Sequence, residues 1–259
     1  MSRRVLLAIP AYRCAEQIRR VIRALKAESR LRQEIERVIV FDNCSPDTTA
    51  IDALSEVRGA GLADWIHIVR NDGNYGIGGT HKLAFNYALE ERFSHVIIFH
   101  GDAQGQASEI ELILKGFESG HEAVLGSRFM AGSFRPGYSK VRTFGNHVLN
   151  LIFSALTFRI ISDLGSGLNG FSSACFVDRG YLSLSNQFNF NAEFLLHLIR
   201  SKIDFVFVPI TWTEEDQVSN ARNFRVAIQM MKSLLKWRFG ISNRNAIESY
   251  SFQLVDEER

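Results

Sequence analysis

Residues that could bind a ligand or a metal ion occur in five short polar clusters, each directly after an apolar run. The clusters cover residues 10–13, 42–49, 74–79, 100–104 and 126–129. In the fourth cluster Asp102 and Gln104 are two positions apart, so their side-chain oxygens could reach one divalent cation. A single aspartate in such a place is usually a turn residue or a helix cap. The prediction of a site therefore depends on all five clusters together.

The apolar runs before the clusters predict strands, at residues 5–9, 37–41, 65–69, 96–99 and 123–125, with a late strand at 205–210. Segments with helical spacing alternate with these runs. One helix is expected at 143–157, where the apolar stripe is Phe144, Val148, Leu151, Ile152 and Ala155. The alternation predicts an α/β fold with a mostly parallel sheet. Ligands bind beyond the carboxyl ends of such strands, so we expect the five clusters at one edge of the sheet.

The composition excludes several classes of protein. The 30 basic and 28 acidic residues nearly cancel, which argues against a nucleic-acid partner. No apolar run reaches the roughly 20 residues of a transmembrane helix, and the 3 scattered cysteines fit reduced thiols in the cytoplasm. We expect one main domain at residues 1–215 and a C-terminal helical appendage with a tail at 216–259.

The order and spacing of the clusters resemble the family 2 glycosyltransferases, especially the branch of dolichol-phosphate mannose synthase and the bacterial polyprenyl-phosphate glycosyltransferases. That branch shows P-x-Y-N-E, D-D-x-S-P-D-x-T, a glycine-rich N-x-G segment, D-x-D-x-Q and G-S-R-F/Y. The resemblance covers about residues 5–210. It implies a GT-A fold, with a Rossmann-like sheet flanked by helices. It also implies an inverting hexosyl transfer from a nucleotide diphosphate, such as a UDP-sugar, to a polyprenyl-phosphate or sugar acceptor in glycolipid or cell-surface polysaccharide synthesis.

The resemblance assigns a divalent metal, Mg²⁺ or Mn²⁺, to Asp102, Gln104 and His100. A cation there would neutralise the charge that develops on the diphosphate leaving group. His100 stands where most members have the first aspartate of D-x-D, although a related subset reads H-G-D-x-Q. Because imidazole suits manganese better than magnesium, the preferred metal is left open. Gly101 is expected to let the backbone approach the phosphates closely.

The nucleoside is assigned by resemblance to Pro10, Ala11, Tyr12, Asp42 and Asn43. Tyr12 could stack on the base or belong to the core. Asn43 replaces an acidic residue of the family, and an amide both donates and accepts. We therefore expect relaxed selectivity among pyrimidine nucleotides, with uridine favoured over guanosine.

The glycine-rich segment that starts at Gly76 opens a helix, whose free N–H groups could face a phosphate. A turn that needs glycine only for packing is the alternative. Lys82, further along the same helix, could reach the diphosphate or simply be a solvated helix lysine.

Two further residues are assigned to catalysis by resemblance. Arg128 matches a residue that lines the sugar or acceptor-phosphate pocket, and Glu193 is a candidate general base or charged organiser of the acceptor site. The alternatives are a surface arginine and a helix-surface glutamate. Asn169 and Asn220 stand where the lipid-phosphate enzymes have basic residues, which weakens the prediction of a polyprenyl-phosphate acceptor more than that of a glycosyltransferase.

A second class of function stays open, namely a non-catalytic partner subunit that binds a nucleotide sugar and keeps the GT-A fold. The departure at His100 favours it, whereas Asp102, Gln104 and Arg128 argue against it. The amphipathic segment 224–239 is rich in methionine, leucine and basic residues. It could dock at the inner face of a membrane, which would make this cytoplasmic protein a peripheral one, or form a homodimer contact, or pack on the sheet.

Overall fold

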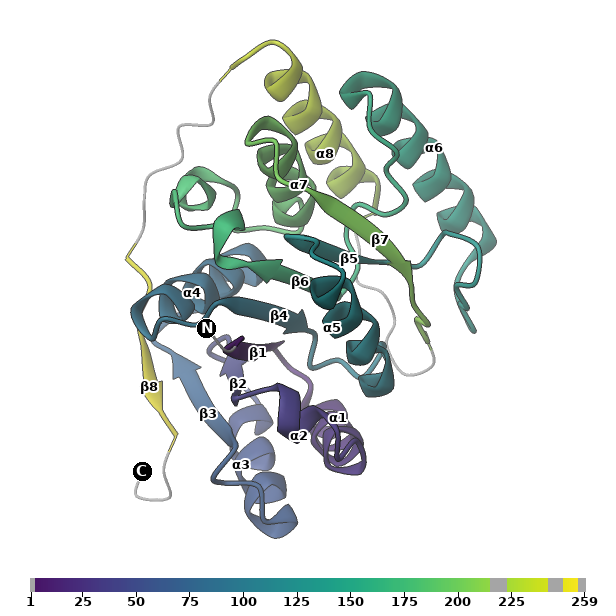
Figure 1. Ribbon diagram of the computed structural model, residues 1–259. Coiled ribbons are helices and arrows are strands. Elements are labelled where there is room, and N and C mark those ends of the chain that lie inside the picture. Colours follow the sequence, from purple (N-terminus) through teal and green to yellow (C-terminus); the bar gives the residue numbers. More distant parts are fainter. Residues whose placement is uncertain (1–2, 215–222, 242–248, 256–259) are drawn as a thin grey trace.

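The computed structural model describes residues 3–214, 223–241 and 249–255 and places its strands in one sheet (Figure 1). The strand order is β7-β5-β6-β4-β1-β2-β3-β8. Neighbours among β1 to β4 pair in parallel, as do β5 and β7, whereas β6 and β8 run antiparallel to their neighbours. The strands are β1 (Val5–Ala11), β2 (Arg37–Asp42), β3 (Ile66–Asn71), β4 (His95–Phe99), β5 (Ala123–Ser127), β6 (Leu168–Ser172), β7 (Phe205–Pro209) and β8 (Phe252–Leu254).

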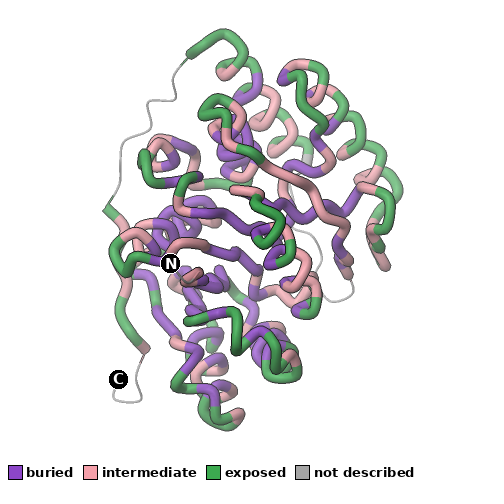
Figure 2. Tube along the Cα trace, in the orientation of Figure 1, coloured by how far each residue is buried: buried purple, intermediate pink, exposed green. Residues whose placement is uncertain are grey.

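Helices cover both faces of the sheet because its central strands are apolar on both sides. One face carries α1 (Ala15–Ala27), α3 (Thr49–Ala60) and α5 (Ile110–Glu118). The other face carries α4 (Gly76–Glu90), α6 (Lys140–Thr157), α7 (Phe190–Arg200) and α8 (Asn223–Arg238). Short connections include α2 (Leu31–Glu34), η1 (Ala107–Glu109), η2 (Ser173–Cys175) and η3 (Gly180–Ser183). The central strands are buried along their length (Figure 2).

The predicted α/β fold with a mostly parallel sheet is confirmed. The six strands expected from apolar runs are all present, and the C-terminal helix is α8. Two strands were not predicted, since β6 contains Asn169 and Gly170 and β8 has only 3 residues. The proposed domain boundary at residue 215 lies outside the described residues, so the division into domains stays a prediction. Beyond it, β8 pairs with β3 in the main sheet.

Helix α6 has most of its predicted apolar stripe on the outside, whereas Ile152 packs on the core. Phe144 and Leu151 are 71% and 70% exposed, whereas the buried side chains of this helix are Asn150, Phe153 and Thr157. An apolar stripe normally faces the core, so this orientation is unusual. None of the described helices is long and apolar enough to cross a membrane.

Candidate active site

The sheet topology brings the five polar clusters to one edge, as the sequence predicted. Strands β1, β2, β3 and β4 are parallel, so the residues that follow them emerge on the same side. Strand β5 is antiparallel to β6, which is antiparallel to β4. Consequently β5 ends at the same edge as β4, and Arg128 follows it there.

A cavity of about 350 Å³ lies at these strand ends, and we call it the strand-end cavity. Its walls come from the segments after β1, β2, β3 and β4 and from the loop before α7. Six of the predicted ligand-binding residues line it: Pro10, Ala11, Tyr12, Asn43, Gly76 and Asp102. His100 also lines it, whereas Asp42, Lys82, Gly101 and Gln104 do not.

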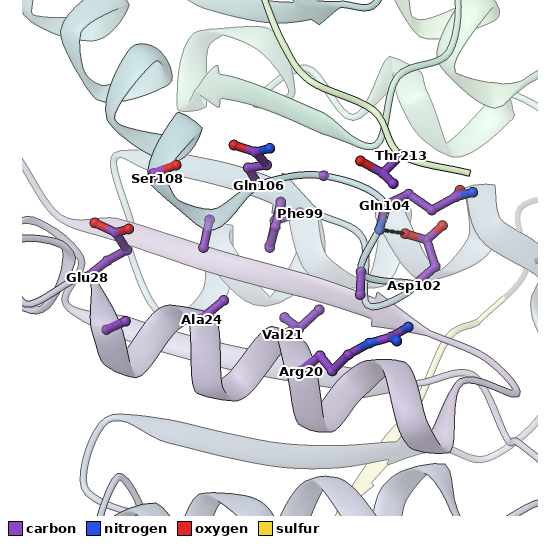
Figure 3. Close-up of a pocket in the computed structure, with 14 residues that line it drawn as sticks. Arg20, Val21, Ala24, Glu28, Phe99, Asp102, Gln104, Gln106, Ser108 and Thr213 are labelled. Atoms are coloured by element: carbon purple, nitrogen blue, oxygen red, sulfur yellow. Dashed lines mark hydrogen bonds between the residues drawn. The ribbon is translucent and has the colours of Figure 1, made fainter. Parts of the chain in front are cut away.

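The three predicted metal ligands do not all share one cavity. A groove of about 490 Å³, the α1 groove, runs along α1. Asp102 lines both this groove and the strand-end cavity. Of these two sites, Gln104 lines only the α1 groove and His100 lines only the strand-end cavity. Figure 3 shows Asp102 and Gln104 side by side at one end of the α1 groove, with Glu28 at the other end. The backbone N–H of Gln104 donates to Oδ1 of Asp102 at 3.2 Å.

The donor set nevertheless fits a cation that shares its coordination with a diphosphate. Among the described residues, no group of three His, Cys, Asp or Glu side chains could hold a metal ion alone. A magnesium-like ion needs only one or two protein carboxylates when substrate phosphates supply further oxygens. Asp102 is the one carboxylate among the described residues around the strand-end cavity. Nε2 of His100 is buried without a hydrogen-bond partner in the part of the chain that the structure describes.

Gly101 has a packing role at the end of β1, and the predicted close approach of its backbone to phosphates stays a prediction. A Cβ atom at Gly101 would lie 3.2 Å from the Cβ of Ala11, 3.2 Å from the carbonyl of Pro10 and 3.1 Å from Ile18. Its N–H donates to the Pro10 carbonyl at 3.0 Å. The glycine thus lets the loop after β4 lie against the end of β1.

The amide of Asn43 is engaged by the protein. Its Oδ1 accepts from the N–H of Tyr75 at 2.9 Å and from Asn71 at 3.2 Å, and its Nδ2 donates to Asn74 at 3.0 Å. Asn43 therefore fixes the loop after β3 and also lines the strand-end cavity, and relaxed pyrimidine selectivity stays a prediction.

Asp42 is fully buried, and burial raises the pKa of its carboxyl group. Oδ2 of Asp42 accepts from the N–H of Ser45 at 3.2 Å, whereas Oδ1 has no partner among the described residues. That unpartnered oxygen keeps Asp42 a candidate acceptor for a nucleoside donor.

The glycine-rich start of α4 is built for packing, the alternative that the sequence left open. A Cβ at Gly76 would lie 2.3 Å from the Asn186 carbonyl, and one at Gly78 would lie 2.4 Å from the Ser185 carbonyl. The N–H of Gly76 donates to Asn74, and that of Gly78 donates to Asn186. These two N–H groups of the helix start are thus already used by the protein.

Lys82 does not extend toward the strand-end cavity, so the prediction that it reaches a diphosphate is wrong. Only 1% of the residue is exposed. Its Nζ donates to the carbonyls of Leu182 at 3.2 Å and Leu184 at 2.6 Å, to Oδ1 of Asn186 at 2.7 Å and to the Tyr250 hydroxyl at 3.3 Å. The ammonium group joins α4, the segment before α7 and the C-terminal segment.

Replacing Lys82 with alanine is therefore expected to destabilise the fold by about 3 kcal/mol or more, because buried acceptors lose a charged donor. Urea unfolding measures this change. The control Lys115→Ala removes an exposed lysine that lies 3.6 Å from Glu111 and should change the free energy of unfolding by less than about 1 kcal/mol. A stable Lys82→Ala protein with weakened nucleotide binding would contradict the structural role.

The buried His81 and the partly buried His100 lie in contact beside the strand-end cavity. The rings of His81 and His100 have centroids 5.6 Å apart, and neither Nε2 has a partner among the described residues. Burial lowers the pKa of His81 well below its ordinary value. Burial also lowers the pKa of His100, although the negative charge of Asp102 acts to raise it. Burial also lowers the pKa of His95 to about 4. All three imidazoles are thus neutral in the folded protein near pH 7.

These depressed pKa values predict that stability falls in acid. The unfolded chain takes up protons as the pH drops below about 6.5, whereas the folded chain does not until lower pH. The free energy of unfolding should therefore decrease from pH 7 to pH 5, by up to about 1.4 kcal/mol per pH unit for each fully buried histidine. Urea unfolding at several pH values tests this. His81→Gln should flatten the slope, and the same change at the exposed His147 should not; equal slopes in both variants would refute the assignment.

A second cavity of about 540 Å³, the interhelix cavity, lies between α6, α8 and the loop before α7. His100 lines both this cavity and the strand-end cavity. Its polar lining residues include Arg128, Arg142 and Asn191, and its apolar ones include Leu149 and Met230. No described residue in its lining carries a carboxylate.

Arg128 is held rigidly at the wall of the interhelix cavity. Its Nε and Nη2 each donate to the carboxylate of Asp163 at 2.8 Å, and its backbone N–H donates to the same carboxylate at 2.9 Å. The guanidinium also lies 5.6 Å from the ring of Trp212. Its Nη1 has no hydrogen-bond partner among the described residues, so one donor edge remains for a ligand.

Glu193 is turned away from both cavities, so its predicted role as a general base is wrong. One carboxylate oxygen accepts from the N–H of Ser185 at 2.7 Å, and the other accepts from Asn189 at 2.9 Å and Ser233 at 2.6 Å. These bonds tie α8 and α7 to the loop that carries Phe188, which lines both cavities. An organising role for Glu193 is therefore retained.

Several lining residues were missed by sequence reasoning. Arg142 comes from the first turn of α6. Asn191 lies at the start of α7, and Phe188 lies just before this helix. None of them follows a strand, and position after a strand was the signal that located the five clusters. Asn169, which stands where an arginine is common, donates to the Ser166 carbonyl at 2.9 Å and lines neither cavity. Asn220 lies outside the described residues.

The chain has a mostly parallel sheet with a cavity at its strand ends, which is the place where α/β proteins of this kind bind ligands. The model of the glycosyl transferase family 2 matches residues 7–179, and the chain belongs to this family. Its fold is the GT-A fold. Among curated proteins, the uncharacterized protein MJ1222 of Methanocaldococcus jannaschii is 26% identical over 235 residues, which cover 89% of this chain and 90% of that protein.

Solved structures of glucosyl-3-phosphoglycerate synthase from Mycobacterium tuberculosis share the fold. The complex with phosphoglyceric acid has a TM-score of 0.67 at 15% identity and covers 98% of this chain and 88% of that one. The complex with Mn²⁺, uridine diphosphate and glucosyl-3-phosphoglycerate has a TM-score of 0.66 at 14% identity and covers 98% and 87%. At these identities the likeness establishes the fold alone.

Proposed function

We propose that the chain transfers a sugar from a UDP-sugar to a polyprenyl-phosphate acceptor, with a divalent cation at Asp102. The observation that carries this proposal is the pair of cavities that share His100. The strand-end cavity combines the polar groups of Asn43, Asn74 and Asp102 with the ring of Tyr12, a mixture that suits a nucleotide. The interhelix cavity combines apolar walls with Arg128 and Arg142, the combination that a lipid phosphate requires.

In the proposed reaction a phosphate oxygen of the acceptor attacks the anomeric carbon and forms the new C–O bond. The bond from that carbon to the diphosphate breaks, and UDP leaves with the electron pair, so the configuration inverts. A bound cation would neutralise the leaving charge. Because an ionised phosphate needs no general base, the lack of a carboxylate among the described lining residues of the interhelix cavity suits it better than a sugar hydroxyl.

The resemblance to the dolichol-phosphate mannose synthase branch supports the same acceptor class. The missing arginine at Asn169 is offset in this proposal by Arg128 and Arg142. Arg142 donates to Glu214 at 2.5 Å and lies 4.4 Å from the Tyr138 ring, so it is held in place at the cavity wall. A saccharide is the alternative acceptor, and the transfer assay includes it.

The donor class is tested by thermal unfolding with a panel of nucleoside diphosphates and nucleotide sugars, with and without Mn²⁺. A ligand at about 100 times its dissociation constant adds roughly 2.7 kcal/mol of stability. We expect stabilisation by UDP compounds that depends on the metal. Stabilisation by GDP compounds alone would overturn the proposed donor.

The non-catalytic alternative is favoured by one observation, the histidine in place of the first aspartate of the motif. A partner subunit would bind the UDP-sugar and show the same stabilisation, but it would never release UDP above the rate of the uncatalysed reaction. Turnover with an isoprenoid phosphate therefore separates the two functions.

A further inference from the structure

The outward face of α6 forms a continuous apolar surface. Six residues spaced three or four apart share it, and all are exposed: Val141, Phe144, Val148, Leu151, Ala155 and Phe158. The first four are 81%, 71%, 39% and 70% exposed, and Phe158, directly after the helix, is 84% exposed. We call this set the α6 face.

The α6 face continues into the rim of the interhelix cavity. Val141 belongs to both, and Phe188 and Phe224, which also line that cavity, are 69% and 81% exposed. Helix α8 lies beside α6 in Figure 1 and contacts it. Its own exposed apolar residues include Ile228 and Leu235, at 42% and 45%.

The two helices beside this surface carry charges of one sign only. Residues 140–160 and 223–239 contain no aspartate or glutamate. Their basic residues are Lys140, Arg142, Arg159, Arg225, Lys232, Lys236 and Arg238. Arg142 is paired with Glu214, and the remaining cations leave a net positive charge beside the apolar stripe. Such a surface is complementary to one that is apolar inside and anionic outside.

We infer that the α6 face lies on the surface of an anionic lipid bilayer, with α6 in the plane of the headgroups. A helix with one apolar face and no carboxylate binds in this way without spanning the membrane. The sequence had left a membrane contact, a homodimer contact and packing on the sheet open for segment 224–239. In the structure α8 closes the core with one side, where Leu234 is buried and Trp237 donates to the Leu196 carbonyl at 2.8 Å. The inference concerns a surface and does not depend on the transfer reaction.

The test uses the full chain and vesicles of phosphatidylcholine, with and without phosphatidylglycerol. The variant is Phe144→Ser with Leu151→Ser. The matched control is Ile51→Ser with Val177→Ser, which removes apolar residues that are 64% and 63% exposed outside α6 and α8. We expect wild type and control to bind the anionic vesicles and the α6 variant to bind at least about tenfold more weakly.

Urea unfolding of all three proteins shows whether the α6 variant is folded, and UDP binding is measured on each as a separate readout. This readout also separates the surface from the proposed donor, since either can fail alone. The inference is overturned if the α6 variant binds vesicles like wild type or if wild type does not bind anionic vesicles. It is also overturned if light scattering shows that the wild type is a dimer and the α6 variant a monomer, and the wild type does not bind vesicles. A second copy of the chain would then cover this face.

Discussion

Replacing Asp102 with asparagine is expected to lower kcat/KM for sugar transfer by about three orders of magnitude or more. The substitution keeps the size of the side chain but removes the one carboxylate among the described residues that line the strand-end cavity. A cation that stabilises a leaving diphosphate contributes several kcal/mol in the transition state, and each 1.4 kcal/mol or so is worth a factor of ten in rate. Radiolabelled transfer measures the loss, and calorimetry measures the loss of metal-dependent UDP binding.

The matched control is Asp72→Asn, which changes an exposed aspartate after β3 that lines neither cavity. It should leave transfer within about twofold of wild type, as is usual for a surface change away from a site. Metal-dependent UDP binding that persists unchanged in Asp102→Asn would refute the assignment of the cation to this carboxylate.

The second large effect is expected at Arg128. Replacing it with methionine leaves the buried carboxylate of Asp163 without its bidentate partner. Breaking one side of a buried ion pair destabilises by about 3–5 kcal/mol. Transfer should fall as well, by about two orders of magnitude, because the charged donor at the wall of the interhelix cavity is gone.

A double variant separates these two effects. In Arg128→Met with Asp163→Asn, the buried negative charge is removed, while an amide oxygen can still accept from the N–H of Gly165, which now donates at 3.0 Å. We expect urea unfolding to show most of the stability restored and the transfer assay to show none of the activity restored. A double variant that regains transfer would mean that Arg128 acts only through stability.

The sequence predicted the parallel part of the sheet well, because its strands are continuous apolar runs. It missed β6, whose Asn169 and Gly170 interrupt the apolar pattern. Gly170 is needed there because a Cβ would lie 2.2 Å from Ile113 of α5. Such a requirement comes from a neighbour far along the chain and leaves no periodic signal.

Side-chain direction was harder to predict than position. The clusters after the strands did meet at one edge, since topology fixes where each strand ends. Lys82, however, donates to the Leu184 carbonyl, and Glu193 accepts from the Ser233 hydroxyl. No motif identifies these partners, which are close in space but distant along the chain. The stripe on α6 was found by its spacing, but spacing alone does not say whether a stripe faces the core or the outside.

The most direct test of the proposed activity is sugar transfer by the purified chain. It is incubated with radiolabelled UDP-sugars, Mn²⁺ and a short isoprenoid phosphate, and both labelled lipid and released UDP are counted. We expect labelled lipid and UDP in equal amounts, with no product when the metal is chelated. UDP-sugar binding without any release of UDP, for isoprenoid phosphate and saccharide acceptors alike, would contradict it and would identify the chain as a binding subunit.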